Sequence, residues 1–343
     1  MKLRAGIVLI LLMQAIVYIG CEKSKLGIIS KEPQLMEIPV GFPSMSIPED
    51  NTFTTERWQL GKKLFYDKKL SLNNTISCGS CHRQEFAFSD SLAFSPGDLG
   101  AMGVSNVPAL ANIGYHPYYL RGGSVPTLEM QVLVPVQEHN EFNMEILDLA
   151  ERLKQDSTYS VMALKAYKRE LDPFVITRAI ACFERSLISG NSRFDQYYYQ
   201  NKKNALTANE LNGMNLFFSE KTNCSGCHRD FNFTNYSFEN NGLYLQYADS
   251  GRMRFTHVES DRDKFKVPTL RNIALTAPYM HDGSLKNLEA VIEHYNSGGV
   301  NHPNKSVLLK PLHLSAQEKQ DLIAFLKTLS DDNFIRDKRF KNE

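Results

Sequence analysis

Apolar residues recur at steps of three and four along two well-separated stretches of the chain. The segments NMEILDLAERLKQD (143–156) and EKQDLIAFLKTLSD (318–331) both show this spacing, which is typical of amphipathic helices. The four-residue segments TANE (207–210) and SAQE (315–318) have the form of capping boxes and predict helix starts. The region 142–200 has the pattern of an interrupted helical segment. No stretch alternates convincingly as a strand, so the pattern predicts an all-α protein.

The first twenty residues have a different character. Lys2 and Arg4 precede a short apolar run that ends at Gly20-Cys21, which is the form of a secretory signal peptide over 1–20. A small residue directly before a cysteine resembles a bacterial lipoprotein box, with Cys21 as the lipidated first residue of the mature chain. A plain signal peptide or a single N-terminal anchor are the alternatives. All three place the protein outside the cytoplasm, in the periplasm or as a cell-envelope lipoprotein, with 21–50 as the tether of the lipid anchor.

Charge and cysteine content narrow the class of protein. Lys and Arg number 39 and Asp and Glu number 38, so no basic surface for nucleic acid is expected. An exported protein normally pairs its cysteines as disulfides. Here four of the six cysteines fall in two C-x-x-C-H units. These units are Cys78, Cys81 and His82, then Cys224, Cys227 and His228. Of the others, Cys21 belongs to the anchor, and Cys182 on an apolar helix face is expected to be a small core residue.

A C-x-x-C-H unit can be a zinc loop, a redox dithiol or a haem attachment site. Zinc would need a further pair of Cys or His residues, and no such pair follows either unit. A thioredoxin-type dithiol would need a βαβ context, which is not visible. Two units in one exported chain therefore predict two covalently attached haem c groups. His82 and His228 are then the proximal iron ligands.

The surroundings of the two units repeat as well. LGKKLF precedes the first and NGMNLF the second, and F-x-F follows each histidine. Further on, VPALANIGYHPYYLRGGSVPTLE (107–129) parallels VPTLRNIALTAPYMHDGSLKNLE (267–289). The repeat predicts two tandem cytochrome c-type haem domains that arose by internal duplication. The first, with connecting helices, covers 51–200, and the second covers 201–335.

These motifs resemble those of the bacterial diheme cytochrome c peroxidases, a family that includes the methylamine-utilisation diheme maturase. The resemblance rests on LFYDKKLSLNNTISCGSCHRQEFAFSD, FKVPTLRNIALTAPYMHDGS and AIACFERSLISGNSRFDQY, and runs from about Thr55 to Leu329. It implies a peroxidase that reduces H2O2 to water. The N-terminal haem would be the peroxide site, and the C-terminal haem would receive electrons from a small donor protein, a cytochrome c or a cupredoxin. Family members are often dimers, which makes a homodimer possible.

The resemblance also implies two residues at the peroxide site. Family members place a Gln and a Glu over the N-terminal haem, and the spacing of LEMQVLVPVQEHNEF matches them to Gln131 and Glu141. A carboxylate there can take a proton from one peroxide oxygen and return one to the other. Burial would raise its pKa toward neutrality, and Gln131 could hold the peroxide. Without the resemblance, both residues would be taken as helix-surface or solvated groups.

A calcium site between the domains is a further implication. The family uses an Asn side chain and backbone carbonyls, which match Asn106, Thr276 and Pro278. Oxygen ligands on loops suit Ca²⁺. The alternative is that Asn106 only caps the turn at Val107.

The chain departs from the family pattern at three places. The loop SPGDLGAMG after the first unit lacks the histidine that often serves as a removable sixth ligand. Asp98 falls nearest that position, and Met102 is the remaining candidate, although loop methionines usually do not ligate. The expected result is an N-terminal haem that is open without prior reduction.

The second and third departures concern the C-terminal haem and the path between the haems. Tyr295 stands where many members have a Met ligand. The maturase has a Tyr at this position, which implies Tyr295 as the ligand, and Met280 and His294 are the other candidates. His281 is expected near the haems without ligating iron. The Trp that often lies between the haems is replaced by Leu120, so transfer would be direct or through Tyr118 or Tyr119.

Three remaining residues have ordinary expectations: Trp58 is expected in the core, and His116 and His139 at the surface. Two alternative functions stay open. One is a maturase-like diheme oxidase that acts on a protein substrate. The other is a non-enzymatic diheme electron carrier with both haems six-coordinate.

Overall fold

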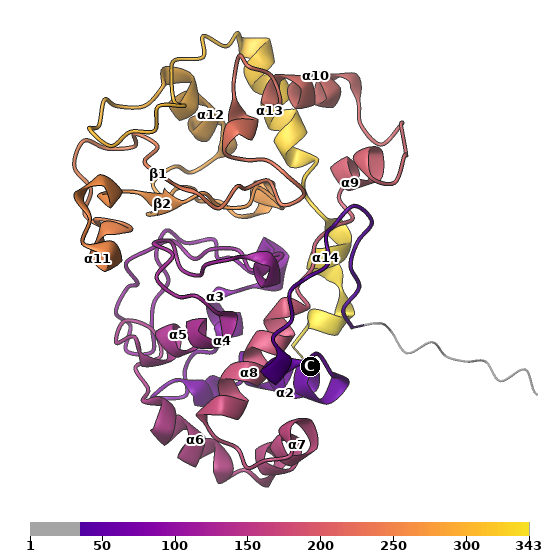
Figure 1. Cartoon of the computed structure of the whole chain (residues 1–343), viewed down its shortest axis with the longest axis vertical. Coiled ribbons are helices and arrows are strands. Elements are labelled where there is room, and N and C mark those ends of the chain that lie inside the picture. The colour runs from indigo at the N-terminus through magenta and orange to yellow at the C-terminus, as the bar shows by residue number, and fades with distance from the viewer. Residues whose placement is uncertain (1–34, 343) are drawn as a thin grey trace, which may run out of the picture. The chain divides into compact units, whose positions relative to one another are not determined.

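The computed structural model describes residues 35–342 (Figure 1). The predicted signal peptide and the lipidated Cys21 lie outside this range, as does the first part of the tether. Within residues 35–342 no helix has the length and apolar character needed to cross a membrane. The helices predicted from periodicity are present, and both capping boxes form as expected.

The regular secondary structure of the described chain is almost entirely helical. Its α-helices are α2 (Thr55–Tyr66), α3 (Cys78–Cys81), α4 (Leu128–Gln131), α5 (Leu133–Gln137), α6 (Ile146–Lys154), α7 (Ser157–Tyr167), α8 (Pro173–Arg185), α9 (Arg193–Tyr198), α10 (Ala208–Phe217), α11 (Met253–Thr256), α12 (Leu288–Ser297), α13 (Ala316–Lys327) and α14 (Asp332–Arg336). Short 3-10 helices cover Glu49–Asn51, Lys68–Leu70, Gln84–Phe86, Ile113–Tyr115, Cys224–Gly226, Glu259–Asp261, Ile273–Leu275 and Lys338–Phe340. One feature was not predicted: β1 (Phe238–Glu239) and β2 (Phe265–Lys266) pair antiparallel.

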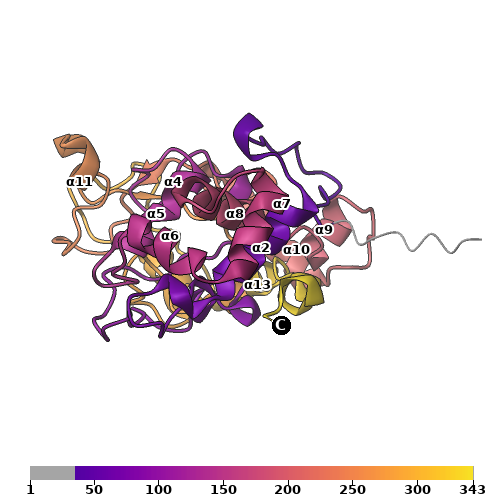
Figure 2. The ribbon, with the colours of Figure 1, turned by 90° about the horizontal axis from the view of Figure 1, so that it is seen from below.

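The two C-x-x-C-H units are each supported by a crossed pair of helices. Helix α2 crosses α8 (Figure 2), and α10 crosses α13. At each crossing a glycine lets the backbones touch. A Cβ on Gly61 would lie 1.9 Å from the carbonyl oxygen of Ala179, and a Cβ on Gly213 would lie 1.9 Å from that of Asp321. The repeated LGKKLF and NGMNLF segments thus place their glycines in the same role, which supports two cytochrome c-type domains.

We expect Gly61→Ala to destabilise the protein. The new methyl group would meet backbone that cannot rotate away, and overpacking of this kind costs about 1–3 kcal/mol. That cost outweighs the gain of roughly 1 kcal/mol from removing glycine from a helix interior. Thermal unfolding of the haem-loaded protein measures the effect. Gly103→Ala is the control, because its nearest contact would be an ordinary 3.4 Å from Ser95; equal thermal midpoints for the two variants would contradict the prediction.

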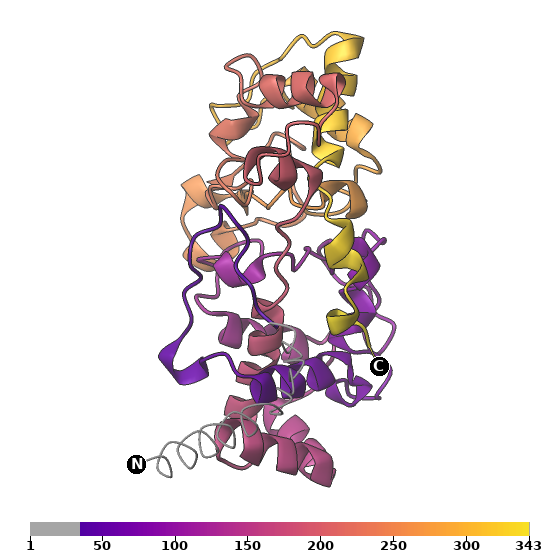
Figure 3. The ribbon, with the colours of Figure 1, turned by 90° about the vertical axis from the view of Figure 1, so that its right-hand side faces the viewer.

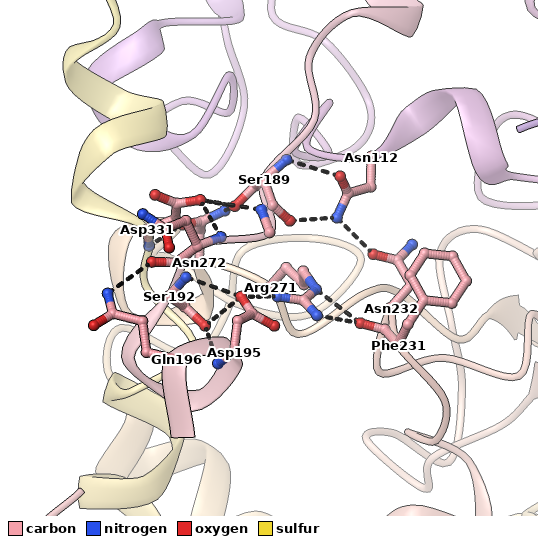
Figure 4. Close-up of polar contacts among 12 residues, drawn as sticks. Asn112, Ser189, Ser192, Asp195, Gln196, Phe231, Asn232, Arg271, Asn272 and Asp331 are labelled. Atoms are coloured by element: carbon pink, nitrogen blue, oxygen red, sulfur yellow. Dashed lines mark hydrogen bonds and ion pairs between the residues drawn. The ribbon is translucent and has the colours of Figure 1, made fainter. Parts of the chain in front are cut away.

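The asparagines of the repeated V-P-x-L-x-N-I motif contact the ends of the same long helices. Asn112 and Asn272 both adopt left-handed backbone, and each N–H donates to a carbonyl just beyond a long helix, Leu187 after α8 and Leu329 after α13. Their side chains meet around Ser189: Asn112 Nδ2 donates to its carbonyl, and Asn272 Nδ2 donates to its Oγ (Figure 4). The two copies of the motif are therefore joined through one node.

A buried ion pair lies beside this node. Arg271 and Asp195 have fully buried side chains and meet at 2.7 Å (Figure 4). The same guanidinium donates to the carbonyl of Phe231, in the F-x-F segment after His228. A buried pair of this kind is costly to break, because the remaining partner becomes an uncompensated charge.

The end of the chain returns to the first half of the molecule. Helix α14 contacts the 3-10 helix Gln84–Phe86. In Figure 3 the yellow end of the chain lies beside purple segments of the first half. Phe334 and Phe340 pack on Phe88 with ring centroids 5.6 and 6.1 Å away, and the Gln84 amide donates to the Phe334 carbonyl. Thus Phe334 and Phe340 belong to the N-terminal hydrophobic core, and a separate core serves the C-terminal half.

Candidate functional site

Both proximal histidines are held in the same orientation. His82 Nδ1 donates to the Phe88 carbonyl at 2.8 Å, and His228 Nδ1 donates to the Phe233 carbonyl at 3.1 Å. With Nδ1–H engaged, Nε2 keeps the lone pair that would ligate the iron of a bound haem. Phe88 and Phe233 both have positive φ, which aims their carbonyls at the rings. The repeated F-x-F is therefore part of the histidine support.

The cysteines fit covalent haem attachment. Cys78 and Cys81 open and close α3, and Cys224 begins the 3-10 turn that ends before Cys227. All four are free thiols and partly accessible. A ring nitrogen with a free lone pair directly follows each pair of thiols, and this donor set suits haem c.

Glu141 lies near the first attachment site. Its charge acts on the thiols of Cys78 and Cys81, whose pKa values are raised first by burial. Glu141 is exposed as a residue. Burial of its carboxyl group by the surrounding chain nevertheless raises its pKa to about 7, and the charge of Glu138 adds to the rise. A carboxyl group with this pKa can accept and return a proton near neutral pH.

The loop that lacks a histidine has a structural role beside Glu141. The Asp98 N–H donates to the Glu141 carbonyl at 2.8 Å. The Asp98 carboxylate accepts from the N–H groups of Asn73 and Thr75. Asp98 thereby connects its own loop to the loop that precedes Cys78. Met102 is half exposed, across a β-bridge from Pro96. The Asp98 carboxylate is thus engaged by backbone, and the open N-terminal haem stays a prediction.

Gln131 is the last residue of α4 and is partly buried. In the described part of the chain no hydrogen bond joins its amide to Glu141. Its role over the haem therefore stays a prediction.

A buried acid near the first haem was missed from sequence. Glu184 on α8 acts on the Cys78 thiol, and burial raises the pKa of Glu184 to about 8. Its neighbour Arg185 pairs instead with buried Glu129 at 2.6 Å. The available signal was an acidic residue within the apolar run AIACFERSL.

At the C-terminal site the structure brings Tyr295 toward the attachment cysteines. Burial raises the pKa of Tyr295, its hydroxyl bonds to the Asn241 side chain, and it interacts with the Cys227 and Cys224 thiols. Asn241 also contacts the two other candidate ligands. Its side-chain amide nitrogen lies 3.2 Å from Met280 Sδ, and its backbone carbonyl lies 3.0 Å from His294 Nε2. The His294 ring is therefore bonded to backbone. Asn241 was missed from sequence because it lies in a loop without a motif.

His281 stacks on Phe265 with ring centroids 4.2 Å apart, and its carbonyl accepts from the N–H of Asn106. The predicted place of His281 near the haems stays a prediction.

The predicted calcium ligand Asn106 is engaged by a guanidinium. Arg121 Nη2 donates to its carbonyl at 2.6 Å and to its Oδ1 at 3.1 Å. The peptide bond between Ala277 and Pro278 is cis, and Thr276 directly precedes Ala277. A calcium ion would have to share Asn106 Oδ1 with Arg121, so calcium stays a prediction that Arg121 opposes.

The residues expected along the path between the haems have varied surroundings. Tyr118 is exposed, whereas Tyr119 is buried in the first core near Glu129. Trp58 is a core residue as predicted, and its Nε1 donates to Ser186. His116, expected at the surface, has a buried Nε2 without a partner.

Comparisons with known proteins agree with this geometry. Residues 55–204 match the family described as di-haem cytochrome c peroxidase, and residues 211–330 match cytochrome c. The methylamine utilization protein MauG of Methylorubrum extorquens is 35% identical over 83% of this chain and 81% of its own. The chain belongs to the diheme cytochrome c peroxidase family.

Other relatives in this family extend over similar lengths. The cytochrome c551 peroxidase of Nitrosomonas europaea is 33% identical over 80% of both chains. A crystal structure of a MauG-like protein associated with microbial copper homeostasis has a TM-score of 0.84, at 36% identity, and covers 89% of this chain and 98% of that one. The family thus includes both peroxidases and MauG proteins, and its two haem c domains account for the paired sites.

Proposed function

We propose that the protein is an exported diheme peroxidase that reduces H2O2 to two molecules of water with two electrons and two protons. The observation that carries the proposal is the Glu141 carboxylate, which lies near Cys78 and Cys81 and has a pKa of about 7. When bound, the haems supply the redox chemistry.

The chain itself would manage the protons and the geometry. Glu141 takes the proton from one peroxide oxygen and returns it to the departing oxygen, while Gln131 holds the peroxide. Phe88 and Phe233 orient the two histidines through their carbonyls. Electrons enter at the His228 haem from a small cytochrome c or cupredoxin. In this proposal Cys21 holds the protein to the cell envelope by a lipid.

The test is to add one equivalent of H2O2 to the oxidised, never-reduced protein and to follow optical and EPR spectra. Because the loop lacks a histidine and the Asp98 carboxylate is engaged by backbone N–H groups, we expect rapid loss of a high-spin ferric signal. Two low-spin haems that do not react, even after one-electron reduction, would instead establish a diheme electron carrier.

A second candidate is a maturase-like oxidase that acts on side chains of a partner protein. The observation in its favour is Tyr295, which interacts with the thiols of Cys227 and Cys224 and with the Asn241 side chain. A tyrosinate ligand would favour ferric iron. Steady-state turnover of H2O2 with a reduced cytochrome supports the peroxidase. Turnover that requires a bound protein substrate supports the oxidase.

A further inference from the structure

Two cations meet in the interior where the first half of the chain contacts the second. Lys266 on β2 donates from its backbone N–H to the Arg121 carbonyl at 2.7 Å. Its Nζ donates to the Tyr118 carbonyl at 2.7 Å and lies 3.3 Å from Nδ1 of His116. Burial and the nearby Arg121 lower the pKa of Lys266 to about 7.

Neither cation has a carboxylate within ion-pair distance among the residues that the structure describes. The Arg121 guanidinium donates to the two oxygens of Asn106, and the carboxylates of Asp282 and Asp249 act on it from farther away. Among residues 35–342 no Asp or Glu forms an ion pair with Arg121 or Lys266. A buried charge without a counterion strongly destabilises the folded protein, because its desolvation is not compensated. Asp282 and Asp249 offset part of the Arg121 charge, whereas none of the described carboxylates acts on Lys266. An anion from outside the polypeptide would complete the balance.

His116 adds an unused donor to the same place. When Lys266 is charged, its ammonium group can only donate, so His116 Nδ1 then accepts from it and the ring proton sits on Nε2. That Nε2 is buried and has no partner, and the same is true of Ser124 Oγ in the adjoining loop. The group that binds here must accept hydrogen bonds and carry negative charge.

The position of the cluster identifies the ligand class. Lys266 stands two residues before Pro268, whose carbonyl interacts with His228, and the loop of His116 and Arg121 follows Pro108, whose carbonyl interacts with His82. Each haem carries two propionate groups, and both haem segments lead to this cluster. We propose that Lys266, Arg121 and His116 form a carboxylate site that binds haem propionate between the two halves of the protein.

The proposal predicts a redox effect that is separate from peroxide turnover. It rests on the attachment of two haems and not on the peroxidase reaction. A cation beside a propionate favours the reduced haem, which carries one more negative charge. In Lys266→Met the ratio of reduced to oxidised haem at a fixed potential should fall about tenfold for one haem, or 59 mV for a one-electron couple.

Redox titration followed by EPR separates the two haems and so identifies which of them supplies the propionate. Lys266→Arg should restore the potential. Lys310→Met removes the same charge from an exposed position and should leave both potentials unchanged. Unchanged potentials in a fully loaded Lys266→Met protein would overturn the proposal, as would an equal shift in Lys310→Met. His116→Phe, which removes the free N–H at similar size, carries the same test if Lys266→Met does not accumulate.

Discussion

Glu141→Gln should lower kcat/KM for peroxide by about 10²–10⁴-fold, the range contributed by general acid–base catalysis. The amide keeps the size of the side chain but cannot accept the peroxide proton. Haem content should stay normal, because Glu141 makes no contact that holds either histidine. Stopped-flow reaction of the haem-loaded protein with H2O2 measures the rate.

Glu138→Gln is the matched control, since it removes a neighbouring charge in the same turn. Its main effect should be a lower pKa of Glu141, because Glu138 contributes to the raised value. A rate in Glu141→Gln within threefold of the unmodified protein would refute the role of Glu141 as the proton acceptor.

The pH dependence of the same rate gives a second check. Glu141 has a pKa of about 7, above its ordinary value, so the carboxyl is protonated below that pH and cannot accept the proton. The rate should therefore rise with pH through a single ionisation near 7 and level off above it. This step should be absent in Glu141→Gln, and a step of equal size in that variant would assign the ionisation to another group.

Arg271→Met should reduce the free energy of unfolding by about 3–5 kcal/mol, because it leaves Asp195 as a buried, uncompensated charge. It also removes the donor to the Phe231 carbonyl, next to the segment that orients His228. Thermal unfolding measures the loss, and the spin state of the C-terminal haem reports the second effect.

Two further variants separate the charge from the packing. Arg271→Met combined with Asp195→Leu should recover part of the stability, because no unpaired carboxylate remains. Arg262→Met breaks an exposed pair with Glu259 and should cost at most about 1 kcal/mol. If Arg271→Met and Arg262→Met had equal effects, the buried pair would not stabilise the junction.

The attachment sites and the long helices could be predicted because their signals are local. Cys78, Cys81 and His82 are adjacent in sequence, and the capping boxes span four residues. The repeated asparagines and F-x-F pairs were visible as a pattern, but their roles depend on contacts with residues such as Leu187 that lie far along the chain.

Residues whose role arises only from distant contacts were not predicted. His116 looked like a surface residue because nothing near it in sequence shows that Lys266, 150 positions later, covers it. Asn241 became visible only where α12 and the Met280 loop meet. Arg121 was noticed as part of a repeated loop, but its hold on Asn106 depends on the packing of that loop.

The return of the chain end to the first core has a consequence for biosynthesis. Phe88 holds His82 through its carbonyl and is itself packed by Phe334 and Phe340. A chain emerges from the ribosome in order, so the residues that complete support of the first haem site are made after both attachment motifs. The core around His82 is therefore complete only after the C-terminal half has been made. A chain truncated after α13 would keep both attachment motifs but lose the packing of Phe334 and Phe340 on Phe88.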